Sequence, residues 1–344
     1  MIREGCCFGL GFALCLALHY HQKPKHTKNK LQPFVCGCLG GLGPKASSVF
    51  YDENILVGRS RLFEAMKQGT LDAVQKVSSA PWTLDEIRRV WNQRKDTGAQ
   101  LRDQDHISLL MYSNPVIPGR PEFMSGQSSV NPVDDMVHTA QALTDAGVSA
   151  LCIVCSTAHY FKEQMLLKVE NAPVFLDMIE LTIQTIIRNN PNGDIIVGLL
   201  GTEPLLKYGI YESAREHTTG AERLKIVTPV SIINGDQSNF TEAIFGPTGV
   251  KAGFDHDLND PDTFHNFELL MEEVLKMQKL GAVSIILGCT ELPLLLTPEN
   301  ISKFGNRLFT THSKEDLAGI SFVNPSQILA DTIIHLSLVS KIAI

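Results

Sequence analysis

Two cysteines occupy matching positions in a repeated sequence pattern. Cys155 closes the apolar run ALCIVC, Cys289 closes the apolar run VSIILGC, and a hydroxyl residue follows each of them, Ser156 and Thr290. A cysteine is active as its thiolate, which can act as a base or a nucleophile. Two thiols facing one small molecule would suit the removal and return of a proton at a carbon next to a carboxylate. These two cysteines are therefore the candidate acid and base.

The segments before the two cysteines share one order of helix, glycine and strand. A glycine stands eight residues before each cysteine, Gly147 before Cys155 and Gly281 before Cys289. Glycine at this position is typical of a helix end. The apolar residues upstream follow helical spacing in both copies: Met136, Ala140 and Leu143 in the first, and Leu270, Val274 and Met277 in the second. Two copies separated by 134 residues indicate two similar domains, each with a thiol at the carboxyl end of a strand.

Near-continuous apolar runs alternate with helical segments along the chain, which favours parallel sheets covered on both faces. The predicted fold class is therefore α/β, with two pseudosymmetric parallel-sheet domains and the active site in the cleft between them. We expect a leader at 1–30, a first domain at 31–172 plus 318–344, and a second domain at 173–317. The expected strands are PFVCGCL, HISLLMY, ALCIVC, DIIVGLL, LKIVTPV and VSIILGC.

The remaining cysteines do not form a recognisable redox or zinc motif. Cys152 and Cys155 have C-x-x-C spacing, but on a strand they point to opposite faces, with Cα atoms roughly 10 Å apart. A disulfide needs Cα atoms within about 7 Å, so Cys152 is expected in the core. Cys36 and Cys38 share a strand face, but no Cys or His pair at finger-like spacing completes a zinc site. Cys155 with His159 is weak support for a metal site, and neither a metal nor a disulfide is expected.

A carboxylate substrate would need fixed cations. Arg120 follows a proline-rich loop after one expected strand, and its planar guanidinium can hold a carboxylate with two hydrogen bonds. Lys251, in the glycine-rich segment GPTGVKAG, is a second candidate. Either residue taken alone is equally consistent with a solvated surface position. His159 and Glu291 follow the two cysteines and either tune the thiols or serve the first turn of a helix.

Composition narrows the classes of partner. The chain has 344 residues, 44% hydrophobic content and net charge −7, which fits a globular protein and argues against nucleic acid. The first 30 residues are basic and contain the uncharged run 6–18, which is too short to span a bilayer. This leader is either a targeting segment, a peripheral membrane anchor with Cys6 and Cys7 as acylation sites, or an unstructured extension. Eight cysteines without paired spacing favour free thiols in a reducing compartment.

In combination, seven short motifs resemble the aspartate/glutamate racemase superfamily. They run in order from about residue 34 to the end of the chain: GGLGP at 40–44, YSNPVIPGR at 112–120, CSTAH at 155–159, GLLGT at 198–202, VKAG at 250–253, LGCTEL at 287–292 and FVNPSQILA at 322–330. The resemblance implies a cofactor-independent homo-oligomeric enzyme, dimer or tetramer, acting on a small carboxylate substrate. It assigns Cys155 and Cys289 as acid and base and places Arg120 and Lys251 on the carboxylate. It also implies five substrate-binding positions: Leu42, Ser156, Thr157, Thr202 and Thr290.

Several positions depart from the pattern of members that act on aspartate. Those members carry Cys-Asn-Thr where this chain has Cys155-Ser156-Thr157, and a methionine at Leu42. They also carry Gly-Thr where this chain reads Glu203-Pro204-Leu205, and losing polar contacts should weaken binding of a polar amino acid. With these changes the chain looks like the algal-type dimethylsulfoniopropionate (DMSP) lyases, which release dimethyl sulfide and leave acrylate. The expected activity is DMSP cleavage, the alternative is an amino-acid racemase, and a third reading is a catalytically silent ligand-binding or membrane-associated protein.

Two further segments carry expectations. Residues 60–105 look like a largely helical insertion, and the apolar run ILADTIIHLSLVSKIAI at the C-terminus is either an oligomer interface or a closing helix packed on the core.

Overall fold

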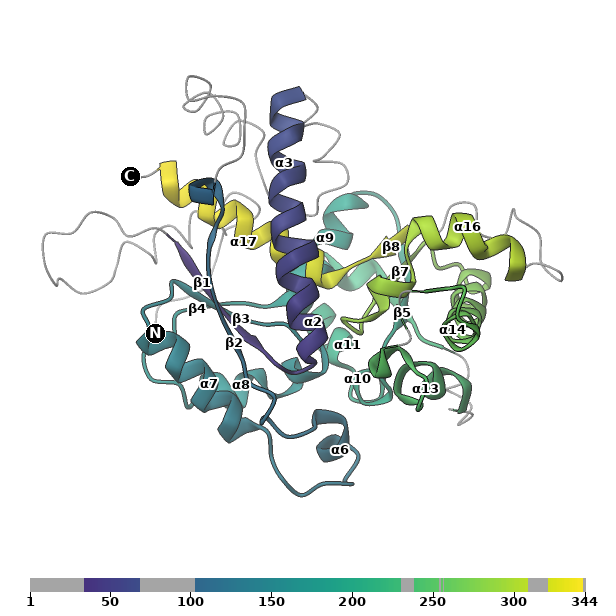
Figure 1. The fold of residues 1–344 in the computed structure, drawn as a ribbon, viewed down its shortest axis with the longest axis horizontal. Coiled ribbons are helices and arrows are strands. Elements are labelled where there is room, and N and C mark those ends of the chain that lie inside the picture. Colours follow the sequence, from purple (N-terminus) through teal and green to yellow (C-terminus); the bar gives the residue numbers. More distant parts are fainter. Residues whose placement is uncertain are drawn as a thin grey trace, which may run out of the picture.

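Two four-stranded parallel sheets lie side by side in the computed structural model, which describes residues 34–68, 103–229, 238–253, 255, 257–308 and 321–342 (Figure 1). The first sheet has the order β2-β1-β3-β4 and the second the order β6-β5-β7-β8, so the two are built to one plan. The strands are β1 Val35–Gly40, β2 Ser108–Ser113, β3 Ala150–Ile153, β4 Val174–Leu176, β5 Ile195–Leu200, β6 Leu224–Val227, β7 Ser284–Leu287 and β8 Ser321–Val323.

The sequence predicted six of these strands, and all six are confirmed. It did not predict β4 and β8, which have only three residues each. β4 pairs with β3 in the first sheet, and β8 pairs with β7 in the second. The chain therefore leaves the first sheet after Leu176 and returns to the first half after Val323, a few residues beyond the expected boundaries at 172 and 318.

Helices cover the faces of both sheets (Figure 1). Pro44–Gln68 runs without interruption through α2, η1 and α3, and so covers the start of the predicted insertion, whose residues 69–102 lie outside the described part of the chain. The helical segments are α2 Pro44–Val49, η1 Phe50–Leu56, α3 Val57–Gln68, η3 Asp103–Asp105, α6 Arg120–Met124, α7 Val133–Asp145, η4 Thr157–Phe161, α8 Lys162–Leu166, α9 Met178–Asn189, α10 Glu203–Lys207, α11 Ile210–His217, η5 Ala221–Arg223, α13 Ser238–Phe245, η6 Val250–Ala252, α14 Pro261–Lys279, α15 Leu292–Leu295, α16 Pro298–Leu308 and α17 Pro325–Ile342.

The repeat seen in the sequence is a structural repeat. Helix α7 precedes β3, and helix α14 precedes β7. Gly147 and Gly281 follow these helices with φ of 82° and 92°, a left-handed conformation that favours glycine. The residues placed on the apolar faces of the two helices are buried: Met136, Ala140 and Leu143 in α7, and Leu270, Val274 and Met277 in α14.

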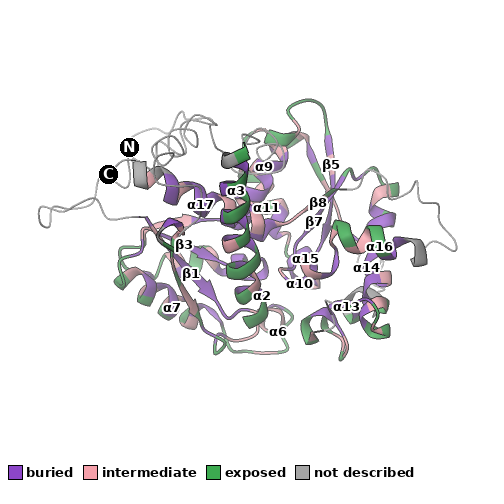
Figure 2. Ribbon diagram, turned by 45° about the horizontal axis from the view of Figure 1, so that its top comes forward, coloured by how far each residue is buried: buried purple, intermediate pink, exposed green. Residues whose placement is uncertain are grey.

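The central strands β1, β3, β5 and β7 and the inner faces of the helices are mostly buried, whereas the outer helix faces and much of the edge strand β2 are exposed (Figure 2). The C-terminal helix α17 packs against α9 and η1, and its apolar residues Ile328, Leu329, Ile333, Ile334 and Leu338 are buried. For residues 325–342 the core-packed alternative is therefore confirmed. The leader at 1–30 lies outside the described residues, and within the described residues no helix combines the length and apolar character needed to cross a bilayer.

Candidate functional site

Cys155 and Cys289 each stand two residues beyond the end of the third strand in their own sheet. β3 ends at Ile153 and β7 ends at Leu287. Both thiols are close to fully buried, with exposed fractions of 9% and 5%. Cys152 is fully buried within β3, as predicted. The carboxyl ends of parallel strands are the usual ligand-binding edge of such sheets, and each sheet brings one thiol there.

Cys289 belongs to a charged network in the second half. Its Sγ donates to Oε2 of Glu291 at 3.1 Å, and Oε1 of the same carboxylate lies 2.7 Å from Nζ of Lys251. The Thr290 hydroxyl also donates to Glu291, at 3.1 Å. Burial and the Glu291 charge raise the pKa of the Cys289 thiol above its ordinary range. Cys289 is therefore held as a protonated thiol, with its hydrogen directed at a carboxylate.

Lys251 connects the two halves electrostatically. Burial disfavours its ammonium form, but the neighbouring Cys289, Glu291 and Cys155 outweigh burial and raise the pKa of Lys251. Burial likewise disfavours the Glu291 carboxylate, but Lys251 outweighs it and lowers the pKa of Glu291. The Lys251 cation thus lies within electrostatic reach of a thiol from each sheet. Lys251 is paired with the carboxylate that accepts the Cys289 hydrogen bond.

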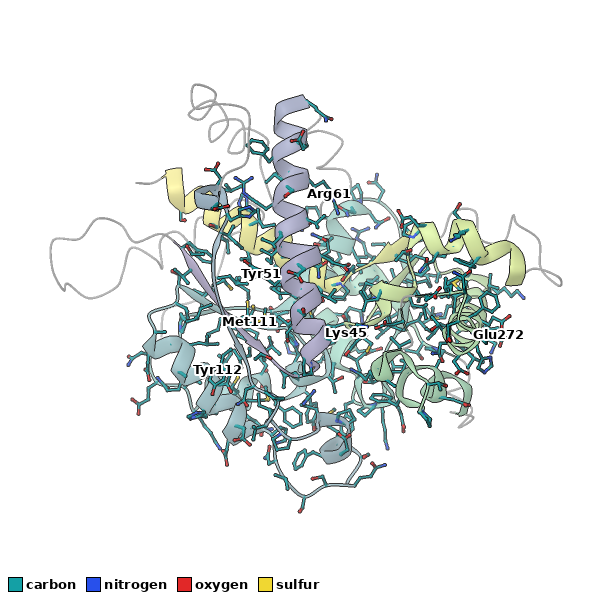
Figure 3. The ribbon with its side chains drawn as sticks, in the orientation of Figure 1. Lys45, Tyr51, Arg61, Met111, Tyr112 and Glu272 are labelled. Carbon is teal, nitrogen blue, oxygen red and sulfur yellow. The ribbon has the colours of Figure 1, made fainter. Side chains whose placement is uncertain are left out.

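Three further contacts join the halves around this network. The hydroxyls of Thr157, after β3, and Thr202, after β5, lie 3.1 Å apart. Lys45 extends from α2 towards the second half and lies 2.6 Å from the carboxylate of Asp255 (Figure 3). Gly43, just before α2, approaches Glu291 so closely that a Cβ there would lie 2.8 Å from Oε1. The glycine loop after β1 therefore packs directly against the carboxylate that pairs with Lys251 and Cys289.

His159 contacts the backbone of the loop that contains Cys155. Its Nδ1 lies 2.9 Å from the carbonyl oxygen of Cys155, and its Nε2 lies 3.7 Å from Asp177. Lys162 pairs with the same carboxylate at 2.5 Å. Burial disfavours the Asp177 carboxylate, but His159 and Lys162 outweigh it and lower the pKa of Asp177. The sequence left open whether Glu291 and His159 tune the thiols or serve the first turn of a helix. Glu291 contacts a thiol, whereas His159 contacts the backbone of the Cys155 loop.

Arg120 forms hydrogen bonds to two loops of the first half, the loop after β1 and the loop after β2. Its guanidinium donates to the carbonyl oxygen of Leu42 and to that of Pro118, the latter at 3.2 Å. Its Nε is buried and has no hydrogen-bond partner among the described residues. Leu42 itself is buried at the end of β1. Arg120 thus lies at the strand-end edge, where it fixes the glycine loop, while its contact with a carboxylate stays a prediction.

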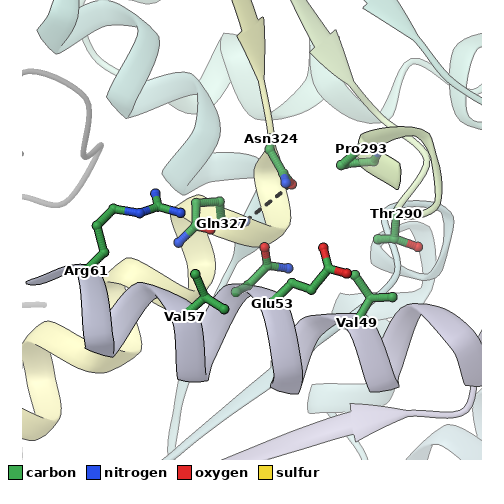
Figure 4. Close-up of a pocket in the computed structure, with 9 residues that line it drawn as sticks. Val49, Glu53, Val57, Arg61, Thr290, Pro293, Asn324 and Gln327 are labelled. Carbon is green, nitrogen blue, oxygen red and sulfur yellow. Dashed lines mark hydrogen bonds between the residues drawn. The ribbon is translucent and has the colours of Figure 1, made fainter. Parts of the chain in front are cut away.

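The other predicted substrate-binding positions also follow strand ends. Ser156 and Thr157 lie after β3, Thr202 lies after β5, and all three are buried. Thr290, after β7, lines a cavity of about 310 Å³ (Figure 4). The other lining residues include Glu53 in η1, Val57 and Arg61 in α3, and Gln327 at the start of α17. Neither catalytic candidate lines this cavity, which reaches the Cys289 loop through Thr290.

Sequence reasoning missed Asp177, Asp255 and the approach of Gly43 to Glu291. Asp177 caps α9, where its side chain accepts from the amides of Ile179 and Glu180. An Asp before a helical run is a recognisable cap signal, although nothing in the sequence connects it to His159. Lys45 and Asp255 are 210 residues apart, and no local pattern could pair them.

With this geometry in place, comparison with known proteins decides the family. Residues 93–311 match the sequence family described as Asp/Glu/hydantoin racemase. The chain belongs to this family. The matched range contains both thiols and both predicted cations, whereas Leu42 and the glycine loop lie before it.

Several named racemases resemble this chain in part of their sequence or in their fold. The glutamate racemase of Aquifex pyrophilus is 27% identical over 182 residues, which are 53% of this chain and 61% of that protein. The aspartate racemase of Picrophilus torridus has a TM-score of 0.57 at 19% identity, covering 88% of this chain and 94% of that one. An aspartate racemase homologue from Pyrococcus horikoshii has a TM-score of 0.50 at 18% identity, covering 89% and 99%. The structural likeness establishes the racemase fold, with its two parallel-sheet α/β domains.

Proposed function

We propose that this protein is a cofactor-independent amino-acid racemase of the aspartate/glutamate type, in which Cys155 and Cys289 exchange a proton with the α-carbon. The observation that carries the proposal is the equivalent position of the two thiols after β3 and β7, with Lys251 paired to the carboxylate that accepts from Cys289. The family and the named relatives point to the same chemistry.

The two thiols start in different surroundings, which supports different first roles. Cys289 donates its hydrogen to Glu291 and has a raised pKa, so it is the proton donor in the resting protein. Cys155 has Lys251 as a cationic neighbour and makes no side-chain hydrogen bond among the described residues. Because Cys289 holds its proton, Cys155 is assigned as the base in the first turnover.

The reaction needs two proton transfers and no change of oxidation state. The Cys155 thiolate takes the α-hydrogen as a proton, and the electron pair left on the α-carbon delocalises into the substrate carboxylate. The Cys289 thiol then gives its proton to the opposite face of that carbon. Lys251 stabilises the negative charge while it moves, in a site from which water is largely excluded. Turnover of the other enantiomer uses the same thiols in exchanged roles.

A second candidate function, DMSP cleavage, is favoured by a specific feature of the side chains near the strand ends. Tyr160, in η4, stacks edge-on against Tyr208 with ring centroids 5.0 Å apart, and both rings are partly exposed. Aromatic faces attract cations such as a sulfonium, and a sulfonium substrate has no ammonium group to recognise. The replacement of a polar segment by Glu203-Pro204-Leu205, with Leu205 fully buried, agrees with such a ligand.

The elimination shares only the first step with racemisation. A thiolate takes the α-proton, the electron pair forms the bond between the α- and β-carbons, and the bond from the β-carbon to sulfur breaks. Dimethyl sulfide leaves as a neutral molecule and acrylate remains. This reaction needs one base and no second proton donor, so it makes a weaker demand on Cys289 than racemisation does.

One experiment separates the candidates. The purified full chain is incubated in D₂O with each enantiomer of aspartate and glutamate, and α-hydrogen loss is followed by NMR while inversion is followed by chiral chromatography. Parallel sealed tubes contain DMSP, and dimethyl sulfide is measured in the headspace. Exchange with inversion supports the racemase. Sulfide release without exchange replaces it with the lyase, and inactivity in all tubes overturns both.

A further inference from the structure

Three thiols that the proposed reaction does not use meet inside the first sheet. Cys36 and Cys38 lie two residues apart on β1 and so share one face, and Cys152 on β3 is the register partner of Cys38. All three side chains have an exposed fraction of 0%. A buried cysteine usually packs as a small hydrophobe and needs no sulfur neighbour. The convergence of three sulfur atoms is therefore the feature that needs an explanation.

The sulfur atoms have the spacing of a metal site. Sγ of Cys152 lies 3.2 Å from Sγ of Cys38 and 3.8 Å from Sγ of Cys36, and all three atoms lie within 4.8 Å of one another. With metal–sulfur bonds of about 2.3 Å, three thiolates around one ion place their sulfur atoms roughly 3.8–4.0 Å apart. The 3.8 Å between Cys152 and Cys36 already falls in this range, and the 3.2 Å between Cys152 and Cys38 would lengthen on binding.

The chemistry of the cluster selects the ion. Thiolates are soft ligands that favour closed-shell ions such as copper(I). Zinc prefers four ligands, and the described residues offer three at this place, all shielded from solvent. We propose that Cys36, Cys38 and Cys152 form a three-coordinate site for a soft, closed-shell metal ion, represented by copper(I). This site is separate from the acid–base pair and does not depend on the proposed function.

Binding exchanges protons for the ion. Each thiol that becomes a ligand loses its S–H proton to solvent and forms a sulfur–metal bond, and neither copper nor sulfur changes oxidation state. The ion's positive charge offsets the buried negative charge that the three thiolates carry.

The location gives the site a structural role. β1 leads into the glycine loop that contains Leu42, and β3 leads to Cys155. A metal bridge between β1 and β3 would fix these two strands relative to each other behind the reactive edge. A ligand that binds only the folded chain stabilises it by mass action, so copper should raise the melting temperature.

The test isolates the three thiols in the full chain. A background variant carries Cys6→Ser, Cys7→Ser, Cys15→Ser, Cys155→Ala and Cys289→Ala, which removes every other thiol. It is titrated anaerobically with copper(I) against bicinchoninate, both as folded protein and during refolding from urea. X-ray absorption then counts the sulfur neighbours of bound copper. The matched comparison adds Cys38→Ala to this background, with folding checked by circular dichroism and Cys36→Ala as the substitute if that variant does not fold.

We expect one copper(I) per chain with three sulfur neighbours at about 2.3 Å, and binding at least about 100-fold weaker after loss of one ligand. No uptake in either format would overturn the proposal. Two sulfur neighbours, or nitrogen and oxygen neighbours, would also overturn it. Unchanged affinity in the comparison variant would do the same. The X-ray absorption result requires no further substitution, so it decides the question even if both comparison variants misfold.

Discussion

Oε2 of Glu291 accepts a hydrogen bond from Sγ of Cys289 at 3.1 Å, two residues along the chain. The same carboxylate binds Lys251, so a buried thiol, a buried anion and a partly exposed cation share one network. The pKa of Cys289 is raised by burial and by this carboxylate. The account therefore makes Glu291 the residue that keeps Cys289 protonated before turnover.

Glu291→Gln should lower the pKa of Cys289. The amide keeps the size of the side chain but removes the negative charge, while the Lys251 cation remains nearby. In a Cys155→Ala background, the rate of Cys289 alkylation by iodoacetamide is measured against pH. Because only the thiolate reacts, we expect the midpoint of this profile to fall by about one pH unit or more. A midpoint that stays in place or rises would contradict the assignment of Glu291.

Gly43→Ala should damage the site through Glu291. The new Cβ would lie 2.8 Å from Oε1, which Lys251 already holds, so the carboxylate must move. We expect turnover to fall by about 10–100-fold, and a loss of about 1–3 kcal/mol of stability. Repeating the substitution in a Glu291→Ala background gives the control. There the backbone strain of an alanine at φ 156° remains but the collision with Oε1 is gone, so the loss of stability should be smaller. An equal loss in both backgrounds would show that the contact with Glu291 is irrelevant.

Arg120→Lys should weaken substrate binding. Lysine keeps the charge but loses the planar fork that holds Leu42 and, in our proposal, the substrate carboxylate. We predict an increase in KM of about tenfold or more with a smaller change in kcat. Arg223→Lys is the matched control, because Arg223 also donates to two backbone carbonyls, in this case of Gly193 and Ile187. Equal effects of the two changes, or an unchanged KM for Arg120→Lys, would remove Arg120 from the site.

Thr157→Val and Thr202→Val test the hydrogen bond between the halves. Each change removes one of two hydroxyls that lie 3.1 Å apart, with little change in shape. Each single variant should lose about 0.5–1.5 kcal/mol of unfolding free energy. The double variant should lose clearly less than the sum, because removing both partners leaves no buried hydroxyl unpaired. Denaturant unfolding of all four proteins gives the cycle, and strict additivity would mean that the bond contributes nothing.

The sequence predicted the parts of the fold that have a strong local pattern. Six strands are apolar runs of four to six residues in the structure, and the helices before Cys155 and Cys289 end at glycines as expected. β4 and β8 were missed because three residues are too short to show a period. Both strands exist because a longer neighbour supplies their hydrogen bonds.

The site was predictable in its residue types but not in its pairings. The position of each thiol followed from the repeat, since equivalent strands end at equivalent edges. The pairing of Glu291 with Lys251 could not be predicted, because Lys251 lies 40 residues earlier and either residue alone looks like a surface charge. The meeting of Cys152 with Cys36 and Cys38 was likewise invisible, because it depends on which strands become neighbours.

The central claim is that one thiol from each sheet acts on a single α-carbon. The most direct test measures the rate of inversion in variants that lack one of these two thiols. Cys155→Ala and Cys289→Ala are compared with the unmodified chain for inversion of the active amino acid in D₂O, with melting temperatures as the check on folding. The account predicts that each variant inverts its substrate at least about 1,000-fold more slowly while still folding. Either variant inverting its substrate at close to the normal rate would contradict the two-thiol mechanism.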